Sequence, residues 1–273
     1  MPTGFTRPFT PQGLASSVPP LPWRFAGDLL LFHFRTDPEA IRGYLPEPLQ
    51  HADASGEAFL WSPRLCCYPT AIEVSELPPA SSAYNVCVVG LPATLDGERT
   101  LYSTFQWCDR DWLVLMSWFL GACSKLASFE ESAIHPLFPT QGIQQTGTTG
   151  TVIKRTVSRQ GQRVVTMGLT LEETITVEDL GFYFRTLPLT SMRHIPGCTP
   201  EDPGRPLVHD LTQMAMENVH FGEPQKGPAT LRFHEADNEE LLPLQPHEVI
   251  AGYKIPMAFT LSGVRSVHDY LKT

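Results

Sequence analysis

Short apolar stretches separated by turn residues follow one another along the chain and predict β-strands. The stretch 29–34 (LLLFHF) is almost continuously apolar, which is typical of a strand buried on both faces. In the segment 150–177, two further strands flank the sequence SRQGQR, where Gly161 supplies a permissive backbone, so a hairpin is expected. Other strands are expected at 84–91, 100–107, 111–119, 182–188, 217–222, 229–235, 249–259 and 264–271.

Helical patterns are weaker and predict only a few short helices. The segment 37–45 (DPEAIRGYL) has Asp37 as an acidic N-cap, Pro38 at the first helical position and Glu39 in the first turn. The 26 prolines are spread through the chain, which favours short strands and turns over long helices. Many antiparallel strands with few helices favour a closed barrel or a packed double sheet, because closure removes exposed edges.

The sequence indicates one domain. We find no internal repeat and no linker-like tract, and expect a loose N-terminal arm at 1–21 followed by a single barrel domain at 22–273. Hydrophobic residues make up 42% of the chain and charged residues 18%, which permits a sizeable core.

Charge and composition narrow the function classes. The formal net charge is −9 and no basic stripe offsets it, which argues against a nucleic-acid partner. The apolar run 112–123 is too short for a membrane span, and the first residues contain no apolar signal region. We therefore expect no membrane partner and a cytoplasmic location. The six cysteines show no metal-ligand spacing, and we expect neither a metal nor a cofactor.

Three segments carry a resemblance to a known family. The segment 34–49 (FRTDPEAIRGYLPEPL) is similar to the strand-to-helix opening of acetoacetate decarboxylases. The segment 219–254 is similar to the C-terminal part of that family, and VHDYLK near the end also matches. Between them, GACSKLA falls where the family has its lysine pair. The resemblance spans roughly Arg24 to Lys272 and implies a closed, cone-like antiparallel β-barrel with the active site inside.

In that family the first lysine of the pair forms a Schiff base with a β-keto acid. The second lysine and burial lower its pKa, because an ordinary lysine amine, with a pKa of about 10.4, is almost fully protonated at neutral pH. Aligned on Lys-Leu-Ala, the position of this nucleophile is Ser124, and only the second lysine remains, as Lys125.

Other positions of the resemblance also lose charge here. The Gly-Arg-Glu before the lysine pair is replaced around 116–118 (MSW). The acidic residues of the family fall at Val86, two places after Tyr84, and near Trp61, and its early arginine falls near Gly27. These changes predict a less charged cavity that contains indole side chains.

Lys125 and Ser124 each allow several interpretations. Lys125 can be a replacement Schiff-base nucleophile, a solvated or ion-paired lysine, or a polar cavity residue that orients or protonates a substrate. Neighbouring side chains of a strand point to opposite faces, so Lys125 points away if Ser124 faces the cavity. Ser124 can be a small residue left in place of a lysine, or a hydrogen-bond donor to a substrate carbonyl.

Other candidate residues complete the expected site. His33 and Arg35 alternate with Phe34 and therefore share one strand face; they form either a polar pair at the barrel mouth or a core histidine beside an ion-paired arginine. Glu172 and Glu173 of the LEET segment alternate in direction, so one of them can face the cavity. The candidates for acid–base catalysis are Lys125, Tyr84, His33 and Glu173, and those for substrate binding are Ser124, Trp61, Val86, Tyr102, Trp118 and Arg35.

The sequence favours an enzyme of this superfamily with non-standard chemistry. The main hypothesis is cyclisation, dehydration or rearrangement of a polyketide-like or keto-acid intermediate in specialised metabolism, inside an aromatic-lined cavity. One alternative is a Schiff-base lyase, a decarboxylase or aldolase-dehydratase, that uses Lys125. Another is a non-catalytic protein that binds small molecules. We also expect a homo-oligomer.

Overall fold

The computed structural model describes residues 1–273 except 53, 123, 133–149, 182–187 and 273. Its strands form one large mixed sheet and a second, four-stranded sheet. Short 3₁₀ helices occur at Val74–Glu76, Pro79–Ser81, Glu178–Leu180 and Leu242–Leu244. The α-helices and strands are β1 (Trp23–Arg35), α1 (Pro38–Tyr44), β2 (Gln50–His51), β3 (Glu57–Pro69), β4 (Ala83–Leu95), β5 (Glu98–Cys108), α2 (Asp111–Leu120), β6 (Ser124–Leu126), β7 (Ser128–Glu131), β8 (Val152–Arg159), β9 (Gln162–Thr170), β10 (Glu173–Thr174), β11 (Leu189–Pro196), β12 (Pro206–Phe221), β13 (Gln225–Gly227), β14 (Ala229–Phe233) and β15 (Glu248–Asp269).

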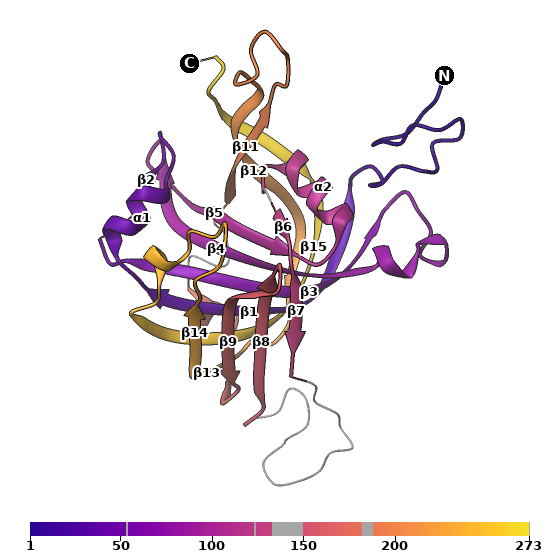
Figure 1. The fold of residues 1–273 in the computed structure, drawn as a ribbon. Helices are drawn as coiled ribbons and strands as arrows, with labels where there is room; N and C mark the ends of the chain where they lie inside the picture. The colour runs from indigo at the N-terminus through magenta and orange to yellow at the C-terminus, as the bar shows by residue number, and fades with distance from the viewer. Residues whose placement is uncertain (53, 123, 133–149, 182–187, 273) are drawn as a thin grey trace.

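The large sheet closes on itself. Its strands follow the order β1-β3-β4-β5-β11-β12-β15, and β15 pairs again with β1 (Figure 1). The pairings around this ring are antiparallel except for β5 with β11, and β6 joins β5 as a further parallel neighbour. The predicted closed, mainly antiparallel barrel with a few short helices is confirmed.

Strands of this barrel are buried on both faces. On one face, Phe32, Phe34 and Leu60 belong to an apolar cluster with residues of the second sheet, β14-β9-β8-β7, such as Val165 and Met167. On the opposite face, side chains of the same strands surround the barrel interior. This double burial explains the nearly continuous apolar sequence of 29–34, because neither face of the strand meets water.

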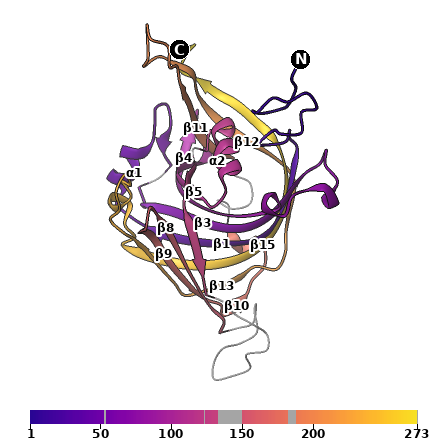
Figure 2. The same cartoon turned by 45° about the vertical axis from the view of Figure 1, so that its right-hand side comes forward.

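The segment 111–119 is a helix, and the prediction of a strand there was wrong. Helix α2 buries Leu113, Met116, Ser117 and Leu120, which have the spacing of one helix face. Figure 2 shows α2 beside β11 and β12, above β3 and β1. An almost entirely apolar segment carries no clear period, so the pattern could not separate a buried strand from a helix. Gly121, with φ of 91°, ends the helix in the left-handed conformation that favours glycine.

Other local predictions have mixed outcomes. The hairpin is confirmed as β8 and β9, and the helix at Asp37 is confirmed as α1, where the Asp37 carboxylate accepts a hydrogen bond from the Glu39 backbone amide. The two strands expected at 249–259 and 264–271 are one continuous strand, β15. The segment 217–222 begins as the end of β12, and 182–187 lies outside the described residues.

The N-terminal segment contacts strand β1 through Val18. Val18 is buried in an apolar cluster with Trp23, and the Thr6 hydroxyl donates to the Val18 carbonyl oxygen at 3.1 Å. Within the described ranges, no helix is long and apolar enough to cross a membrane.

Gly90 on β4 gives a test of how tightly the barrel wall is packed. A Cβ atom at this position would lie 2.1 Å from Cζ3 of Trp61, so Gly90→Ala must displace the indole. We expect this variant to lose about 1–3 kcal/mol of unfolding free energy through overpacking, measured by urea denaturation.

Gly43→Ala is the matched control, because a Cβ atom there meets nothing within 4 Å and the position lies in α1. The control should be neutral or stabilised by up to about 1 kcal/mol. Equal stabilities of the two variants would contradict the described packing of Trp61 against Gly90.

Candidate active site

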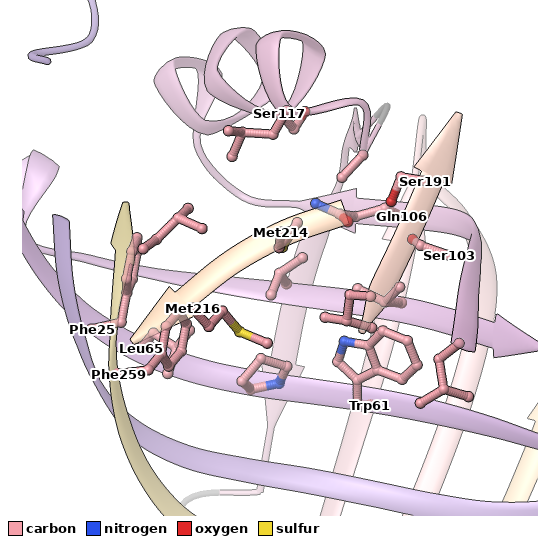
Figure 3. A pocket seen from close by; sticks show the side chains of 18 of the residues that line it. Phe25, Trp61, Leu65, Ser103, Gln106, Ser117, Ser191, Met214, Met216 and Phe259 are labelled. Atoms are coloured by element: carbon pink, nitrogen blue, oxygen red, sulfur yellow. The ribbon is translucent and has the colours of Figure 1, made fainter. Parts of the chain in front are cut away.

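A cavity of about 500 Å³ occupies the barrel interior beneath α2. Its lining includes side chains of the β1, β3, β4, β5, β12 and β15 strands, with α2 along one side (Figure 3). The lining is dominated by apolar residues, among them Phe25, Trp61, Met214, Met216 and Phe259. A cavity of this size and character suits a small organic ligand with a largely apolar body.

The cavity contains little charge. Among the described lining residues, Arg265 on β15 is the one charged side chain, and it is exposed. The other lining residues with polar side-chain atoms are Trp61, Tyr84, Ser103, Gln106, Ser117, Ser191 and Gln213. The sequence-based prediction that catalytic charges are missing from the interior therefore agrees with the composition of this wall.

The pairing of β5 with β6 decides which side chain faces the cavity. Gln106 lies opposite Ser124, and Trp107 lies opposite Lys125. Gln106 lines the cavity, whereas Trp107 belongs to the apolar cluster beneath the second sheet. Because side chains alternate along a strand, Ser124 is on the cavity side and Lys125 is on the side of the second sheet.

The amine of Lys125 is held by the loop that follows β14. Its Nζ donates to the Asn238 carbonyl oxygen at 2.6 Å and lies 3.0 Å from Oε2 of Glu239. The Glu239 side chain is wholly buried and also accepts from Nε1 of Trp107, at 3.2 Å, with Arg159 at 3.7 Å. Lys125 therefore compensates a buried carboxylate and is not among the described lining residues.

Ser124 is buried and connects three elements. Its hydroxyl accepts a hydrogen bond from Nε2 of Gln106 at 2.6 Å and donates to the Ala122 carbonyl oxygen at 3.3 Å. Its backbone amide donates to the Ser117 hydroxyl at 3.1 Å, which in turn donates to the carbonyl oxygen of Val114 in α2. Ser124 thereby ties the end of α2 to β6 and fixes the Gln106 carboxamide.

A comparison with known protein families identifies the family of this chain. The family model for acetoacetate decarboxylase (ADC) matches residues 6–271. The chain belongs to the acetoacetate decarboxylase family.

Individual relatives are distant. Acetoacetate decarboxylase 1 of Mesorhizobium japonicum is 24% identical over 268 residues, covering 94% of this chain and 93% of that protein. The enduracididine biosynthesis enzyme MppR, solved with the condensation product of pyruvate and imidazole 4-carboxaldehyde, has a TM-score of 0.85 at 22% identity, covering 99% and 98% of the two chains. An acetoacetate decarboxylase-like enzyme from Sphingomonas wittichii RW1 has a TM-score of 0.85 at 23% identity, covering 98% and 100%. Structural likeness at these identities establishes the fold.

Three predicted residues of this acetoacetate decarboxylase family member do line the cavity: Trp61, Tyr84 and Val86. Tyr84 packs edge-to-face against Phe25 and Trp112, with ring centroids 6.1 and 5.7 Å away. Burial raises the pKa of the Tyr84 hydroxyl well above its usual value, because the phenolate would be desolvated. Tyr84 is thus a neutral phenol at ordinary pH and can donate a hydrogen bond or a proton.

His33 and Arg35 lie on β1 and are not among the lining residues. His33 stacks on Phe59, with ring centroids 4.7 Å apart, and its Nε2 lies 3.4 Å from Oε2 of Glu57. Burial lowers the pKa of His33, while the Glu57 carboxylate opposes that effect. Arg35 donates to Oε2 of Glu248 at 2.8 Å, so both residues have partners on neighbouring strands.

The remaining predicted residues also lie apart from the cavity. Tyr102 packs with Leu49 and Leu211 in a separate apolar cluster. Trp118 is 40% exposed on α2, away from the buried face of that helix. Glu173 on β10 is exposed, with its Oε1 3.8 Å from the Lys226 amine.

Sequence reasoning missed the polar residues that do line the cavity, above all Gln106 and Ser191. Gln106 lies in the predicted strand 100–107, where strict alternation would have placed it on one face with Tyr102. Ser191 lies on β11, whose parallel partner β5 is distant in sequence, so no local pattern predicts that its side chain faces the cavity. In the described part of the chain, no three His, Cys, Asp or Glu side chains gather in a way that would hold a metal ion.

Lys125→Met tests the structural contribution of this lysine. The variant leaves the buried Glu239 carboxylate with Arg159 and Trp107 alone, so we expect a loss of about 1–3 kcal/mol, less than for a fully buried pair because the lysine is partly exposed. Urea denaturation measures the change in unfolding free energy.

The double variant Lys125→Met/Glu239→Gln should regain much of that loss, because no buried charge remains unpaired. Lys154→Met, on the exposed part of β8, is the control and should change stability by less than about 0.5 kcal/mol. A Lys125→Met variant as stable as the parent protein would show that the ion pair between Lys125 and Glu239 does not stabilise the fold.

Proposed function

We propose that this member of the acetoacetate decarboxylase family is an enzyme that works without a Schiff base. It binds a polyketide-like or keto-acid intermediate in the barrel cavity and catalyses its cyclisation, dehydration or rearrangement. The observation that carries the proposal is the pairing of β6 with β5. Ser124 lies on the same side of the sheet as the lining residue Gln106, and the Lys125 amine is bound to Asn238 and Glu239 on the other side.

An apolar cavity can promote such reactions by holding one conformation of a flexible substrate. Ring closure requires an enol carbon and a carbonyl carbon to be held close together, and binding replaces much of the entropic cost of that encounter. In an aldol-type closure the enol carbon bonds to the carbonyl carbon and the enol proton is transferred to the new alkoxide; loss of water gives the dehydrated product. The Tyr84 phenol, a lining residue that burial disfavours as a phenolate, is suited to relay this proton: its hydroxyl gives a proton to the new alkoxide and regains one from the enol oxygen.

A solved relative supports a substrate of this kind. MppR, which shares the fold over nearly its whole length, was solved with a condensation product of pyruvate and an aldehyde. The cavity of the present protein is of a size to accept a condensation product with an apolar body.

Reductive trapping tests for the Schiff base. Wild-type protein incubated with pyruvate or acetoacetate and borohydride should show no covalent adduct by intact-mass spectrometry, because no free amine lines the described cavity wall. The variant Ser124→Lys places an amine on the cavity side of β6 beside Gln106 and should become labelled.

The labelled variant is the positive control for the trapping chemistry. An adduct on Lys125 of the wild-type protein, mapped by peptide analysis, would overturn the proposal in favour of the alternative, a Schiff-base lyase using Lys125. Labelling of Lys125 only after unfolding in urea would agree with its ion pair to Glu239.

A substrate panel distinguishes an enzyme from a binding protein. Linear aryl β-polyketones and aryl β-keto acids are incubated with the protein and followed by mass spectrometry. We expect products of unchanged mass or products that have lost one water, with turnover reduced about tenfold or more by Tyr84→Phe. Loss of carbon dioxide would favour a lyase, and saturable binding without any product would favour the non-catalytic alternative.

A further inference from the structure

Ser191 presents an unused hydroxyl to the cavity. The residue is 1% exposed, lines the cavity from β11, and its Oγ has no hydrogen-bond partner among the described residues. A buried hydroxyl without a partner costs about 1–3 kcal/mol, and native proteins rarely keep one without a reason. A ligand oxygen in the cavity would supply the missing partner.

Gln106 presents a second polar atom at the same end of the cavity. Figure 3 shows its carboxamide beside Ser191, with Ser103 next to them. Its Nε2 donates to the Ser124 hydroxyl at 2.6 Å, which leaves Oε1 as an acceptor with no protein donor among the described residues. One donor, the Ser191 hydroxyl, and one acceptor, the Gln106 carbonyl oxygen, thus lie together in an apolar surrounding.

Among the described residues, neither the Ser191 hydroxyl nor the Gln106 carboxamide is hydrogen-bonded to a charged side chain. The cation nearest to Ser191 in sequence, Arg193, is held by both carboxylate oxygens of Asp210, at 2.9 and 2.6 Å. Arg265, the one charged residue among the described lining residues, is exposed on β15, where solvent screens its charge. A carboxylate beside Ser191 and Gln106 would be desolvated without an ionic partner, which is strongly unfavourable. A neutral ketone accepts from Ser191, and an enol or phenol hydroxyl donates to Gln106.

We propose that Gln106 and Ser191 form a neutral oxygen-binding subsite that takes the keto–enol group of a β-dicarbonyl substrate. Ser124 acts as a positioning residue that holds the Gln106 carboxamide. This inference rests on the proposed function, namely that the cavity is the substrate site, and it selects the neutral polyketide-like substrate over the keto acid.

Three aryl probes of similar size test the subsite by calorimetry. They are 1-phenylbutane-1,3-dione, which is neutral and enolised, 1-phenylbutan-1-one, which lacks the enol, and 4-phenylbutanoate, which carries a carboxylate. We expect the wild-type protein to bind the dione tightest and the carboxylate at least about tenfold more weakly.

Variants assign each contact. Ser191→Ala should weaken both ketones about three- to tenfold, whereas Gln106→Leu should weaken the dione alone by a similar factor. Ser124→Ala should weaken the dione, and its effect should disappear in the Gln106→Leu background, because it acts through that residue. Ser128→Ala is the matched control for Ser191→Ala: Ser128 lies on β7, outside the cavity lining, and its hydroxyl donates to the Ser158 carbonyl oxygen, so dione affinity should not change.

Thermal unfolding separates a binding role from a structural one. Removing an unpaired hydroxyl should leave the melting temperature of Ser191→Ala unchanged or higher, while a fall would show that the hydroxyl serves the fold and overturn the inference. Carboxylate binding as tight as dione binding, with no response to Ser191→Ala or Gln106→Leu, would also overturn it but leave the cavity as a substrate site. Failure of the wild-type protein to bind any of the three probes would overturn the proposed function together with the subsite.

Discussion

The pairing of β1 with β15 closes the barrel, and the arrangement of the site depends on this closure. A closed wall has an inner and an outer face, and here both are buried: the outer face of β1, β3, β4 and β5 under the second sheet, and the inner face around the cavity. Each residue of these strands is therefore assigned to the packed core or to the cavity by its position alone. Because successive side chains of a strand point to opposite faces, the chemistry of the interior is set by the alternate residues that face inward.

The interior assembled in this way is apolar and almost free of charge, so its few polar groups gain importance. In such surroundings hydrogen bonds are electrostatically stronger than in water, and unpaired polar groups are correspondingly costly. The hydrogen-bonded connection from α2 through Ser117 and Ser124 to Gln106 gives one of those groups a fixed direction. The cavity differs from an ordinary packed core because a few common polar side chains, such as that of Gln106, face into it.

Much of the fold could be predicted from the sequence, because strands buried on two faces leave long apolar runs, as in 29–34. The helix at 111–120 could not, since a uniformly apolar segment has no period, although Gly121 marks its end. For the site, the resemblance drew attention to Ser124, which pairs with the lining residue Gln106, and to Trp61, Tyr84 and Val86, which line the cavity. The partner of Lys125 could not be foreseen, because Glu239 lies 114 residues further along the chain.

The ion pair between Lys125 and Glu239 has a consequence for the register of β6. This strand is only three residues long and pairs in parallel with β5, so its own ladder of hydrogen bonds does little to prevent sliding. A shift by one residue would exchange the two faces, carrying the lysine inward and the serine outward. The buried carboxylate makes that exchange costly, because it would lose its cation. Glu239 thus stabilises the observed register of β6, and this register places the Ser124 hydroxyl, and not the Lys125 amine, on the cavity side of the sheet.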